Sequence, residues 1–466
     1  MLLSLWFLLT LVGITVVIAG VLVYLEVRRH RRRRLGTLRG LRAWTTRLGS
    51  IGLVLALVAV TIADRENRVY QYIPNFGALV GSPSPDMQNG GLNQVGRLVA
   101  NPASAPTTHG VDIEVTVPGP RSHITRIAYV YLPAAYFQPA YRTTHFPVLY
   151  LIHGSPGVAV DWIRGGQVDR TMDHLLSHGA VQPFIIVMPD ANGGFQRDLE
   201  CQNVVHGPED QTYLAEDVPA WVDAHLRTAP DRLHRAIGGL STGAYCGLNL
   251  MFRHQGTFSA AVSHSGTGKP DHGRYTGDLF HGHDVVKLAN TPDHYLRSIH
   301  LRRPTAVYLD AGVRDTWAQG QYRELRPLLL RRGIPTTYHV VADEKHSYGT
   351  WRRNVNLSLP WVSTWFTRHF APTVADHVAR PDTSYLPKRS NHYKHKRVDH
   401  RSHGPVPPPT TKPATTIAQP GAGPVASATR PVDPTTGAAG VGAEFEPPSS
   451  APVGPVNPPV PASTNP

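Results

Sequence analysis

The chain has 466 residues, a formal net charge of +13 and only two cysteines, so its length alone allows two or three domains. Residues 26–47 hold nine Arg and one Glu, and residues 380–401 hold seven Lys or Arg and two Asp, so these two segments carry the whole net charge. The rest of the chain is close to neutral, and the 25 His are scattered or lie in the basic tail. Composition therefore argues against a nucleic-acid-binding protein and against a metal centre.

The N-terminal part predicts a membrane hairpin. Residues 2–25 form an apolar run without a charge, long enough for a hydrocarbon core of about 30 Å. An Arg-rich segment follows, and then a shorter apolar run, Leu48–Ala63. Basic loops beside apolar spans are typically cytoplasmic, so residues 1–64 should form two transmembrane helices in the cell membrane, with everything after Ala63 extracytoplasmic. In the alternative, Leu48–Ala63 is a signal-like segment cleaved after Ala63.

Two further segments are expected to lack a core of their own. Residues 65–110 are rich in Asn, Gly, Pro and Ser without periodicity, which predicts a linker. Residues 373–466 are first basic and His-rich and then mostly Pro, Ala, Thr, Gly, Val and Ser, which predicts a disordered tail. The tail either contacts anionic cell-wall polymers or is solvated without a partner.

Residues 111–372 alternate strand-like and helix-like patterns, which predicts an α/β domain with a mostly parallel sheet. Its length is ample for one buried core. The expected strands are Val111–Val117, Thr125–Leu132, Val148–Ile152, Phe184–Met188, Ala236–Ile237, Ala260–Ser263, Ala306–Asp310 and Thr337–Val341. The expected helices lie near Arg170–His178, Tyr213–Arg227, Ala244–Arg253, Tyr322–Arg332 and Leu357–His369.

Within this domain, the segment Gly239-Leu240-Ser241-Thr242-Gly243 matches the G-x-S-x-G pattern of a nucleophile elbow. An apolar strand precedes it and an amphipathic helix follows it, and an elbow needs this context. The glycines permit a sharp turn that exposes Ser241 over the sheet. The backbone N–H of Thr242 would then point toward a developing oxyanion. The alternative is an ordinary Gly-rich turn.

A serine nucleophile needs a base and an orienting carboxylate, and in α/β-hydrolases these follow in the order Ser, Asp or Glu, His. Asp315 follows the strand Ala306–Asp310, and His346 follows the next strand. Both should lie at the carboxyl edge of the sheet, where ligands bind in open α/β sheets. We therefore expect Ser241 as the nucleophile, His346 as the general base and then acid, and Asp315 as the orienting acid.

Alternatives stay open for two of these assignments. Asp315 could instead cap a helix that begins at Thr316. Asp310 and Asp343 are rival acids in the same region. His346 could be a histidine of a surface loop.

A second oxyanion donor should come from the loop that follows the strand Val148–Ile152. This loop reads His153-Gly154-Ser155-Pro156-Gly157, and the backbone N–H of Ser155 is the candidate. His153 could instead be structural, with its ring bonded to a neighbouring backbone group.

The two cysteines, Cys201 and Cys246, lie in the central domain outside any C-x-x-C spacing. They could form one disulfide if the domain lies outside the cytosol, or they could be two buried thiols. Both interpretations stay open.

Several stretches together resemble the putative-esterase family of α/β-hydrolases, which includes esterase D (S-formylglutathione hydrolase), feruloyl esterases, enterochelin esterases and secreted mycolyltransferases. The matching stretches are Tyr131–Pro133, Pro147–Gly157 with Trp162, Val187–Asp190, Gly239–Gly243, Gly312–Asp315, and His346 with Trp351. The resemblance spans residues 111–370. It implies an α/β-hydrolase fold, the triad Ser241, Asp315 and His346, and hydrolysis or transfer of an acyl group from an ester or thioester without metal or organic cofactor.

The chain departs from one branch of this family. The mycolyltransferases carry an Asp before the glycine of the oxyanion loop and an Arg just after it, whereas this chain has His153 and Pro156 there. The resemblance therefore implies general esterase or acyltransferase chemistry rather than mycolylation of trehalose. The two apolar runs and the tail lie outside the resemblance, and this combination is similar to membrane-tethered envelope enzymes of actinobacteria.

Three functional hypotheses follow. In the first, the protein is a membrane-anchored extracytoplasmic serine esterase whose substrate is an acyl ester of a lipid or envelope component. In the second, the same site transfers the acyl group to a sugar or lipid hydroxyl. In the third, the protein keeps the fold but is a catalytically silent envelope-binding protein. Acceptor choice should depend on loops such as 191–210 and 266–295, whose shapes the sequence does not specify.

Overall fold

The computed structural model describes residues 4–32, 40–73, 90–270, 276–342 and 344–369. The expected tail, residues 373–466, lies outside the described residues, as do the rival acid Asp343 and part of the Arg-rich segment.

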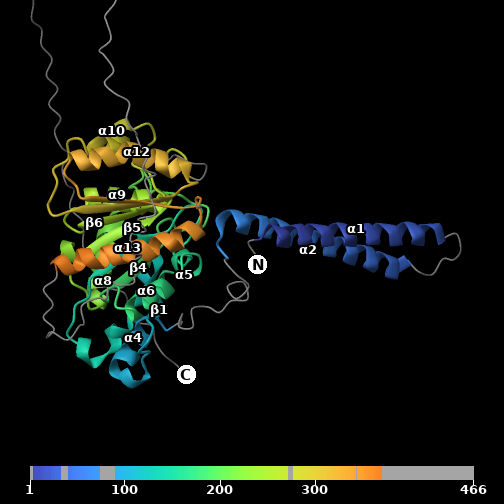
Figure 1. Cartoon of the computed structure of the whole chain (residues 1–466), viewed down its shortest axis with the longest axis horizontal. Coiled ribbons are helices and arrows are strands. Elements are labelled where there is room, and N and C mark those ends of the chain that lie inside the picture. The colour runs from blue at the N-terminus through green and yellow to red at the C-terminus, as the bar shows by residue number, and fades with distance from the viewer. Residues whose placement is uncertain (1–3, 33–39, 74–89, 271–275, 343, 370–466) are drawn as a thin grey trace, which may run out of the picture. The chain divides into compact units, whose positions relative to one another are not determined.

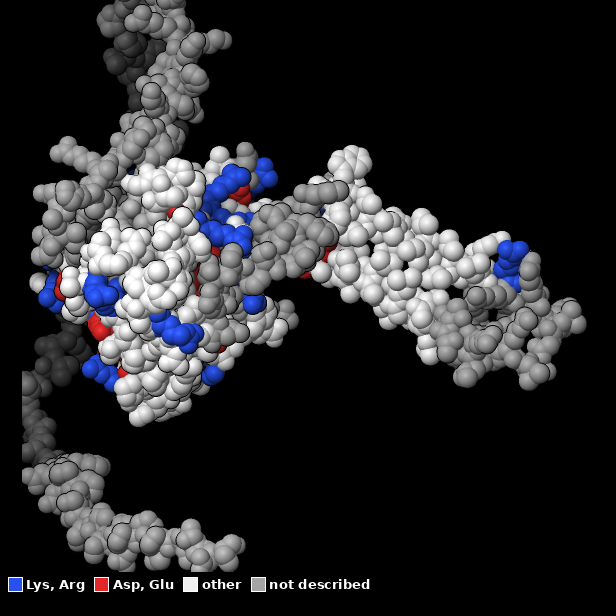
Figure 2. All heavy atoms as spheres, turned by 90° about the horizontal axis from the view of Figure 1, so that it is seen from below, with Lys and Arg blue, Asp and Glu red and all other residues white. Residues whose placement is uncertain are grey.

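Two long helices begin the described chain: α1 (Leu5–Arg32) and α2 (Gly40–Tyr70). They lie side by side as a hairpin (Figure 1). Each contains a stretch that is long and apolar enough to cross a bilayer, Trp6–Leu25 in α1 and Leu48–Tyr70 in α2. Their apolar side chains are largely exposed, and Figure 2 shows the hairpin as a surface without charge over most of its length.

The α/β domain is built on one sheet of eight strands in the order β1-β2-β4-β3-β5-β6-β7-β8. β1 pairs with β2 and β2 with β4 in antiparallel fashion, and all the other neighbours are parallel. The strands are β1 (Val111–Pro118), β2 (Thr125–Leu132), β3 (Val148–Ile152), β4 (Ile185–Pro189), β5 (Arg235–Leu240), β6 (Ala260–His264), β7 (Ala306–Gly312) and β8 (Thr336–Val341). This confirms the predicted fold class, a mostly parallel α/β-hydrolase sheet.

The central strands are buried on both faces, which is why they appear in the sequence as short continuous apolar runs. In β3, Val148, Tyr150 and Ile152 belong to one core cluster. Leu149 and Leu151 belong to the other. Alternate side chains therefore supply the cores on the two faces of the sheet.

Helices cover both faces. The core that includes Leu149 also contains buried side chains of α5 (Asp161–Arg164), α6 (Val168–Ser177) and α13 (Tyr348–His369). The opposite core contains side chains of α8 (Val218–His225), α9 (Thr242–Arg253) and α12 (Thr316–Arg331). α12 and α13 accordingly lie on opposite sides of the sheet (Figure 1). The shorter elements are α4 (Gly91–Ala100), α7 (Asp210–Thr212), α10 (Asp284–Ala289), α11 (Pro292–Tyr295), the 3-10 turns Pro102–Ser104, Ala134–Phe137, Pro139–Tyr141 and Arg232–His234, and a π-helical turn at Tyr213–Asp217.

The segment 65–110 differs from the linker expected there. α2 continues to Tyr70, and α4 forms within the segment. Val95 of α4 is 7% exposed and belongs to a domain core. The sequence missed α4, although Leu92, Val95 and Val99 follow helical spacing, because the helix has only ten residues, two of them Gly, within a segment rich in Gly, Asn, Pro and Ser.

Two helices begin earlier than expected. α12 begins at Thr316 rather than Tyr322, because the carboxylate of Asp315 caps its first turn. α13 begins at Tyr348 rather than Leu357. α12 begins directly after Asp315 and α13 begins two residues after His346, so the helices help to fix the two loops that carry these residues.

Candidate active site

The expected nucleophile lies in the turn between β5 and α9. Ser241 has φ 55° and ψ −121°, a backbone conformation that a non-glycine residue rarely adopts. Its backbone N–H donates to the carbonyl of His264 at the end of β6, at 2.9 Å. The strained turn is thus held by a bond to the neighbouring strand.

Two glycines make room for this turn. A Cβ atom on Gly243 would lie 2.2 Å from the carbonyl oxygen of Ile152, and one on Gly239 would lie 2.3 Å from the carbonyl carbon of Gly243. The obstructing atoms are backbone atoms of buried elements and have no rotamer to move to. Glycine at both places lets β3 and the elbow approach each other closely.

The structure brings Ser241, His346 and Asp315 together in one chain of hydrogen bonds. The Oγ atom of Ser241 lies 2.9 Å from Nε2 of His346. The Nδ1 atom of His346 lies 2.8 Å from Oδ2 of Asp315. The side chain of His346 is 33% exposed and that of Asp315 only 2%. The imidazole is therefore within reach of a ligand, whereas the carboxylate is not.

Asp315 makes a second contact with its other oxygen. Oδ1 accepts a hydrogen bond from the backbone N–H of Ala318 and caps α12. The cap therefore fixes the rotamer that presents Oδ2 to His346. The cap and the contact with the histidine, which the sequence left as alternatives, coexist in one carboxylate.

The charge state of Asp315 sets the direction of the hydrogen bonds. Burial raises the pKa of its carboxyl, but the hydrogen bond and charge of His346, with the hydrogen bond from the backbone N–H of Ala318, lower the pKa below its ordinary value. An ionised carboxylate only accepts hydrogen bonds, so Nδ1 of His346 is the donor. In the neutral imidazole, Nε2 is then the acceptor that faces the hydroxyl of Ser241.

Two indole rings flank the imidazole. The ring centroid of His346 lies 5.8 Å from that of Trp317 and 5.1 Å from that of Trp351, and both contacts are edge-to-face. Trp351 is 4% exposed, whereas Trp317 is 40% exposed at the start of α12. Trp351 thus supports the base from the interior, and Trp317 gives an apolar surface beside it. The sequence did not single out Trp317 as a site residue, although its place two residues after Asp315 was a signal.

Asp310, a rival acid in the sequence, contacts a different histidine. Its Oδ2 lies 2.7 Å from Nδ1 of His264, and the two side chains are 0% and 1% exposed. The amide of Asn354 donates to its other oxygen. Asp315, and not Asp310, is therefore the carboxylate at His346.

The loop after β3 packs against the elbow, as the assignment of Ser155 requires. A Cβ atom on Gly154 would lie 3.3 Å from the Cβ of Ser241. The backbone that leads into Ser155 therefore passes directly beside the nucleophile. The hydroxyl of Ser155 donates to the carbonyl of Arg197 at 3.3 Å, which ties this loop to the segment after β4.

His153 has structural contacts. Its ring is 1% exposed. Nδ1 lies 2.8 Å from the carbonyl of Gly154, and Nε2 lies 3.0 Å from the backbone nitrogen of Ala191. The ring thus joins the loop after β3 to the loop after β4 and is turned away from the catalytic chain of hydrogen bonds.

Thr242, the other expected oxyanion donor, is the first residue of α9. Backbone N–H groups in the first turn of a helix have no intrahelical partner and bind anions readily. The hydroxyl of Thr242 donates to Oδ2 of Asp198 at 3.2 Å. Asp198 is 7% exposed, and burial raises the pKa of its carboxyl. The sequence did not indicate Asp198, because this contact joins residues that are distant along the chain.

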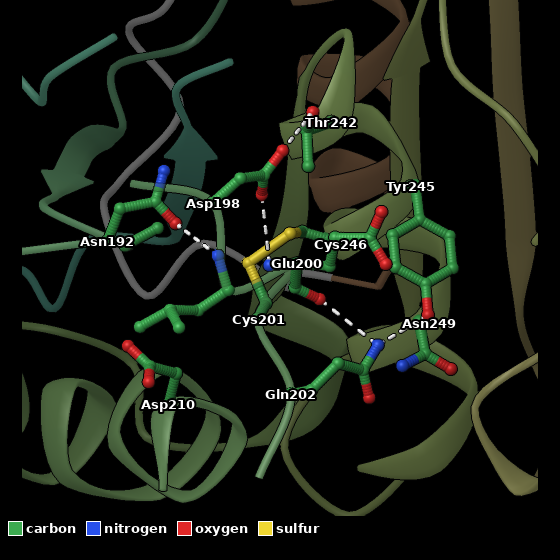
Figure 3. The surroundings of a disulfide bond; sticks show 12 residues. Asn192, Asp198, Glu200, Cys201, Gln202, Asp210, Thr242, Tyr245, Cys246 and Asn249 are labelled. Atoms are coloured by element: carbon green, nitrogen blue, oxygen red, sulfur yellow. Dashed lines mark hydrogen bonds between the residues drawn. A yellow bond between two sulfur atoms is a disulfide. The ribbon is translucent and has the colours of Figure 1, made fainter. Parts of the chain in front are cut away.

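A disulfide between Cys201 and Cys246 joins the segment after β4 to α9 (Figure 3). Of the two interpretations that the sequence left open, the structure therefore has the disulfide. Oδ1 of Asp198 accepts a hydrogen bond from the backbone N–H of Glu200 at 3.0 Å, so the residue that holds Thr242 is bonded next to the bridge. Both cysteines are 1% exposed.

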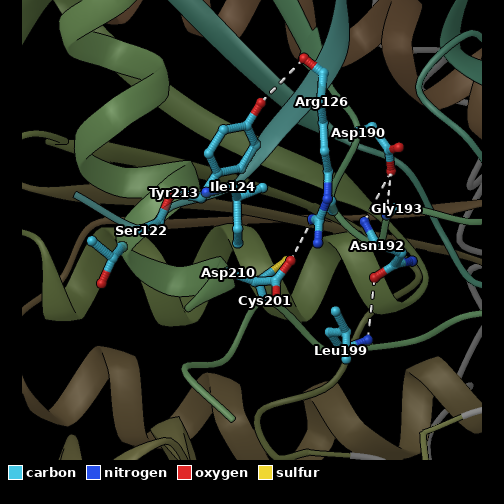
Figure 4. Close-up of polar contacts among 12 residues, drawn as sticks. Ser122, Ile124, Arg126, Asp190, Asn192, Gly193, Leu199, Cys201, Asp210 and Tyr213 are labelled. Atoms are coloured by element: carbon cyan, nitrogen blue, oxygen red, sulfur yellow. Dashed lines mark hydrogen bonds and ion pairs between the residues drawn. The ribbon is translucent and has the colours of Figure 1, made fainter. Parts of the chain in front are cut away.

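A buried ion pair holds the C-terminal end of the segment that follows β4, residues 191–210 (Figure 4). The guanidinium of Arg126 in β2 binds the carboxylate of Asp210, and the side chains are 9% and 0% exposed. Burial raises the pKa of Asp210 to about 6, although the charge and hydrogen bond of Arg126 lower it. Nearby, Oδ1 of Asn192 accepts from the backbone N–H of Leu199 at 3.2 Å. Residues 191–210 are thus a braced loop beside the elbow rather than a free one.

Removing the disulfide should weaken this bracing. The bridge joins residues 45 apart, and for a closed loop of this length the double variant Cys201→Ala/Cys246→Ala should lose about 4 kcal/mol of unfolding free energy. Urea denaturation of the variant and the wild type measures the loss. The single variant Cys246→Ala is the matched control and should lose a similar amount, because either change removes the bridge. Equal denaturation midpoints for the three proteins would contradict a stabilising bridge.

The chain is similar to several known proteins. A family model described as "Putative esterase" matches residues 124–362, just over half of the chain. An uncharacterized protein of Corynebacterium glutamicum is 28% identical over 328 residues, which cover 68% of this chain and 69% of that protein. An esterase of Mycobacterium tuberculosis is 29% identical over 235 residues, which cover 43% of this chain and 49% of the relative. The chain thus spans about half the length of that esterase.

Among solved structures, a ferulic acid esterase superposes with a TM-score of 0.50 at 24% identity, covering 56% of this chain and 100% of that structure. This similarity concerns the fold. The sheet order, with a serine in the turn between β5 and α9, places the chain in the α/β-hydrolase class. Because the family model matches more than half of its residues, the chain belongs to the putative esterase family.

Proposed function

We propose that this protein is a membrane-anchored, extracytoplasmic serine esterase that hydrolyses a carboxylic ester or thioester of a lipid or cell-envelope component. The chain of hydrogen bonds from Ser241 through His346 to Asp315 carries the proposal. These three side chains have the connectivity of a serine hydrolase triad and follow one another in the order of α/β-hydrolases. Membership of an esterase family supports ester bonds as the target.

In the acylation step, the Oγ atom of Ser241 attacks the ester carbonyl carbon while Nε2 of His346 takes the hydroxyl proton. The carbonyl oxygen becomes an oxyanion, which the backbone N–H groups of Thr242 and Ser155 stabilise. The bond from carbon to the alcohol oxygen then breaks, and His346 returns the proton to the departing alcohol. Ser241 is left as an acyl ester, and Asp315 stabilises the transient imidazolium.

In the deacylation step, water attacks the acyl carbon and gives a proton to His346. The bond to Ser241 breaks, the proton returns to Oγ, and a carboxylic acid leaves. If a sugar or lipid hydroxyl replaces the water, the same intermediate yields a new ester, which is the acyltransferase alternative. The partition between the two acceptors is measurable from the products.

The proposed location rests on two features. α1 and α2 contain apolar stretches of membrane-spanning length, so residues 1–64 would form the anchor, and residues 111–372 the catalytic domain. The disulfide between Cys201 and Cys246 fits an oxidising compartment outside the cytosol. The exposed indole of Trp317 beside His346 gives an apolar surface suited to an acyl chain.

Active-site labelling tests the proposal. The full chain, purified in detergent, is treated with a fluorophosphonate probe, and the labelled peptide is mapped. We expect the label on Ser241, together with turnover of p-nitrophenyl butyrate. A folded protein that carries no label at any serine would overturn the esterase proposal in favour of a silent envelope-binding protein. Product analysis with an added alcohol then separates hydrolysis from transfer, because transfer would give the new ester faster than the free acid.

A further inference from the structure

The chain that leaves α2 contacts both sides of the candidate active site. From these contacts we infer that Gln71 and Tyr72 are positioning residues for catalysis. They fix the position of the loop of His346 relative to the segment that follows the oxyanion loop. This inference rests on the proposed esterase function. It gives a positioning role to residues 71–72, which lie before residues 124–362, the part of the chain that the family model matches.

Tyr72 bridges the two sides. Its hydroxyl donates to Oδ1 of Asp161 at 2.9 Å, and Asp161 begins α5, shortly after the oxyanion loop. Oδ2 of the same carboxylate accepts from the backbone N–H of Val158 at 2.9 Å. The ring of Tyr72 packs edge-to-face on Tyr348, with the ring centroids 4.9 Å apart. Tyr348 follows His346 by two residues, so one side chain touches both halves of the site.

Gln71 and Arg352 make a second bridge. The guanidinium of Arg352 donates to the carbonyl of Gln71 at 3.0 Å and to the carbonyl of Gly165, at the end of α5, at 2.6 Å. A Cβ atom on Gly349 would lie 1.7 Å from Oε1 of Gln71. The side-chain amide of Gln71 therefore lies directly against the backbone of the first turn of α13.

The loop that carries His346 also contacts the end of α2. Nζ of Lys345, the residue before His346, donates to the carbonyl of Arg68 at 2.9 Å. The last carbonyls of a helix lack intrahelical partners and attract cations. The cationic side chain next to the base is thereby bound to the C-terminal turn of α2.

The turn after α2 is itself braced. The side chain of Asn67 donates from Nδ2 to the carbonyl of Ile73 at 2.8 Å and accepts at Oδ1 from the backbone N–H of Ile73 at 2.7 Å. Gln71, which lies between them, has φ 53°. A residue with left-handed backbone conformation in a turn closed by two hydrogen bonds indicates a defined turn rather than an irregular connection. The turn that carries Gln71 is therefore closed by hydrogen bonds of its own, directly before Tyr72.

The test uses the full chain in detergent and three variants. Tyr72→Phe removes the bond to Asp161 but keeps the ring, and Tyr72→Ala removes both contacts. Tyr70→Ala is the matched control, because Tyr70 is the neighbouring tyrosine of the same segment and is 51% exposed. Active sites are titrated with the fluorophosphonate, so that every rate is expressed per labelled Ser241. The kcat and KM for p-nitrophenyl butyrate and the rate of labelling are then measured.

We expect kcat per titrated site to fall roughly 10-fold in Tyr72→Ala and by about 3-fold in Tyr72→Phe, with KM little changed, since misplaced catalytic groups slow the chemical step. Labelling should slow in parallel, and Tyr70→Ala should match the wild type. A wild-type kcat in Tyr72→Ala would overturn the inference. If Tyr72→Ala does not fold, a wild-type kcat in Tyr72→Phe overturns it instead. If the wild type itself takes up no fluorophosphonate label, the proposed esterase function is overturned, which is an outcome distinct from failure of this inference.

Discussion

Ser241→Ala should lower kcat for p-nitrophenyl butyrate by about a million-fold while the protein stays folded. The change removes the hydroxyl that lies 2.9 Å from Nε2 of His346 and leaves the backbone of the elbow intact. Any residual rate would come from the oxyanion donors acting on a bound ester and water. Steady-state kinetics with the purified full chain, together with a thermal melt, checks both halves of the expectation.

Two further variants sharpen this test. Ser177→Ala changes an exposed serine at the end of α6 and should leave kcat unchanged. Ser241→Gly should be as inactive as the alanine variant but more stable by about 1 kcal/mol, because glycine adopts a φ of 55° without the strain that a side chain suffers there. An alanine variant that keeps more than a hundredth of the activity would show that another nucleophile performs the reaction.

Asp315→Asn should lower kcat by about ten-thousand-fold. The amide would donate to Nδ1 of His346, which leaves the proton on Nε2, and that nitrogen then has no lone pair for the hydroxyl of Ser241. The loss should appear in kcat per titrated site rather than in KM. Kinetics at several pH values measures it, and a loss of less than tenfold would contradict the orienting role.

Asp310→Asn is the control for this change. Its carboxylate is completely buried and contacts His264, so its replacement should reduce thermal stability and leave the proton position on His346 as it was. A larger loss of kcat per titrated site in Asp310→Asn than in Asp315→Asn would reverse the assignment of the acid.

The lowered pKa of Asp315 also predicts how stability depends on pH. A carboxyl whose pKa is lower in the folded state contributes stability above its unfolded pKa of about 4, and loses it as the pH falls through the folded value. The difference in unfolding free energy between wild type and Asp315→Asn should therefore shrink as the pH drops below about 4. Chemical denaturation at a series of pH values reports this difference.

All eight strands could be placed from the sequence, because most are apolar runs bounded by turn residues, and β8, whose side chains are half-buried or exposed, still has a β-branched and aromatic sequence. Most of their ends lie within two residues of the expected ones, and β5 extends three residues further, to Leu240, which directly precedes the nucleophile. The start of α12 at Thr316 was offered by the sequence only as an alternative to the catalytic role of Asp315, and the early turns of α13 were not predicted. α4 forms because Val95 finds a core that exists only in the folded domain.

The candidate triad could be chosen from chain order and strand ends, since parallel strands bring their carboxyl ends to one edge. The sequence favoured Asp315 but left Asp310 as a rival; the structure separates them, because Asp310 lies within β7 and contacts His264, whereas Asp315 follows β7 and contacts His346. The contacts of Tyr72 with Asp161 and of Arg126 with Asp210 join residues more than eighty positions apart. No local pattern of apolar and polar residues records such pairs.

The burial of the Cys201–Cys246 bridge has a consequence for the order of events during biogenesis. Both cysteines are 1% exposed, so an oxidant can reach the thiols only before the surrounding core has closed. Oxidation must therefore accompany folding, in the compartment where the domain first becomes compact. A chain that folds in a reducing compartment would enclose two thiols, and an oxidant added to the finished protein would reach them only through transient unfolding. Preparations from reducing and oxidising hosts should then be chemically different proteins with the same sequence.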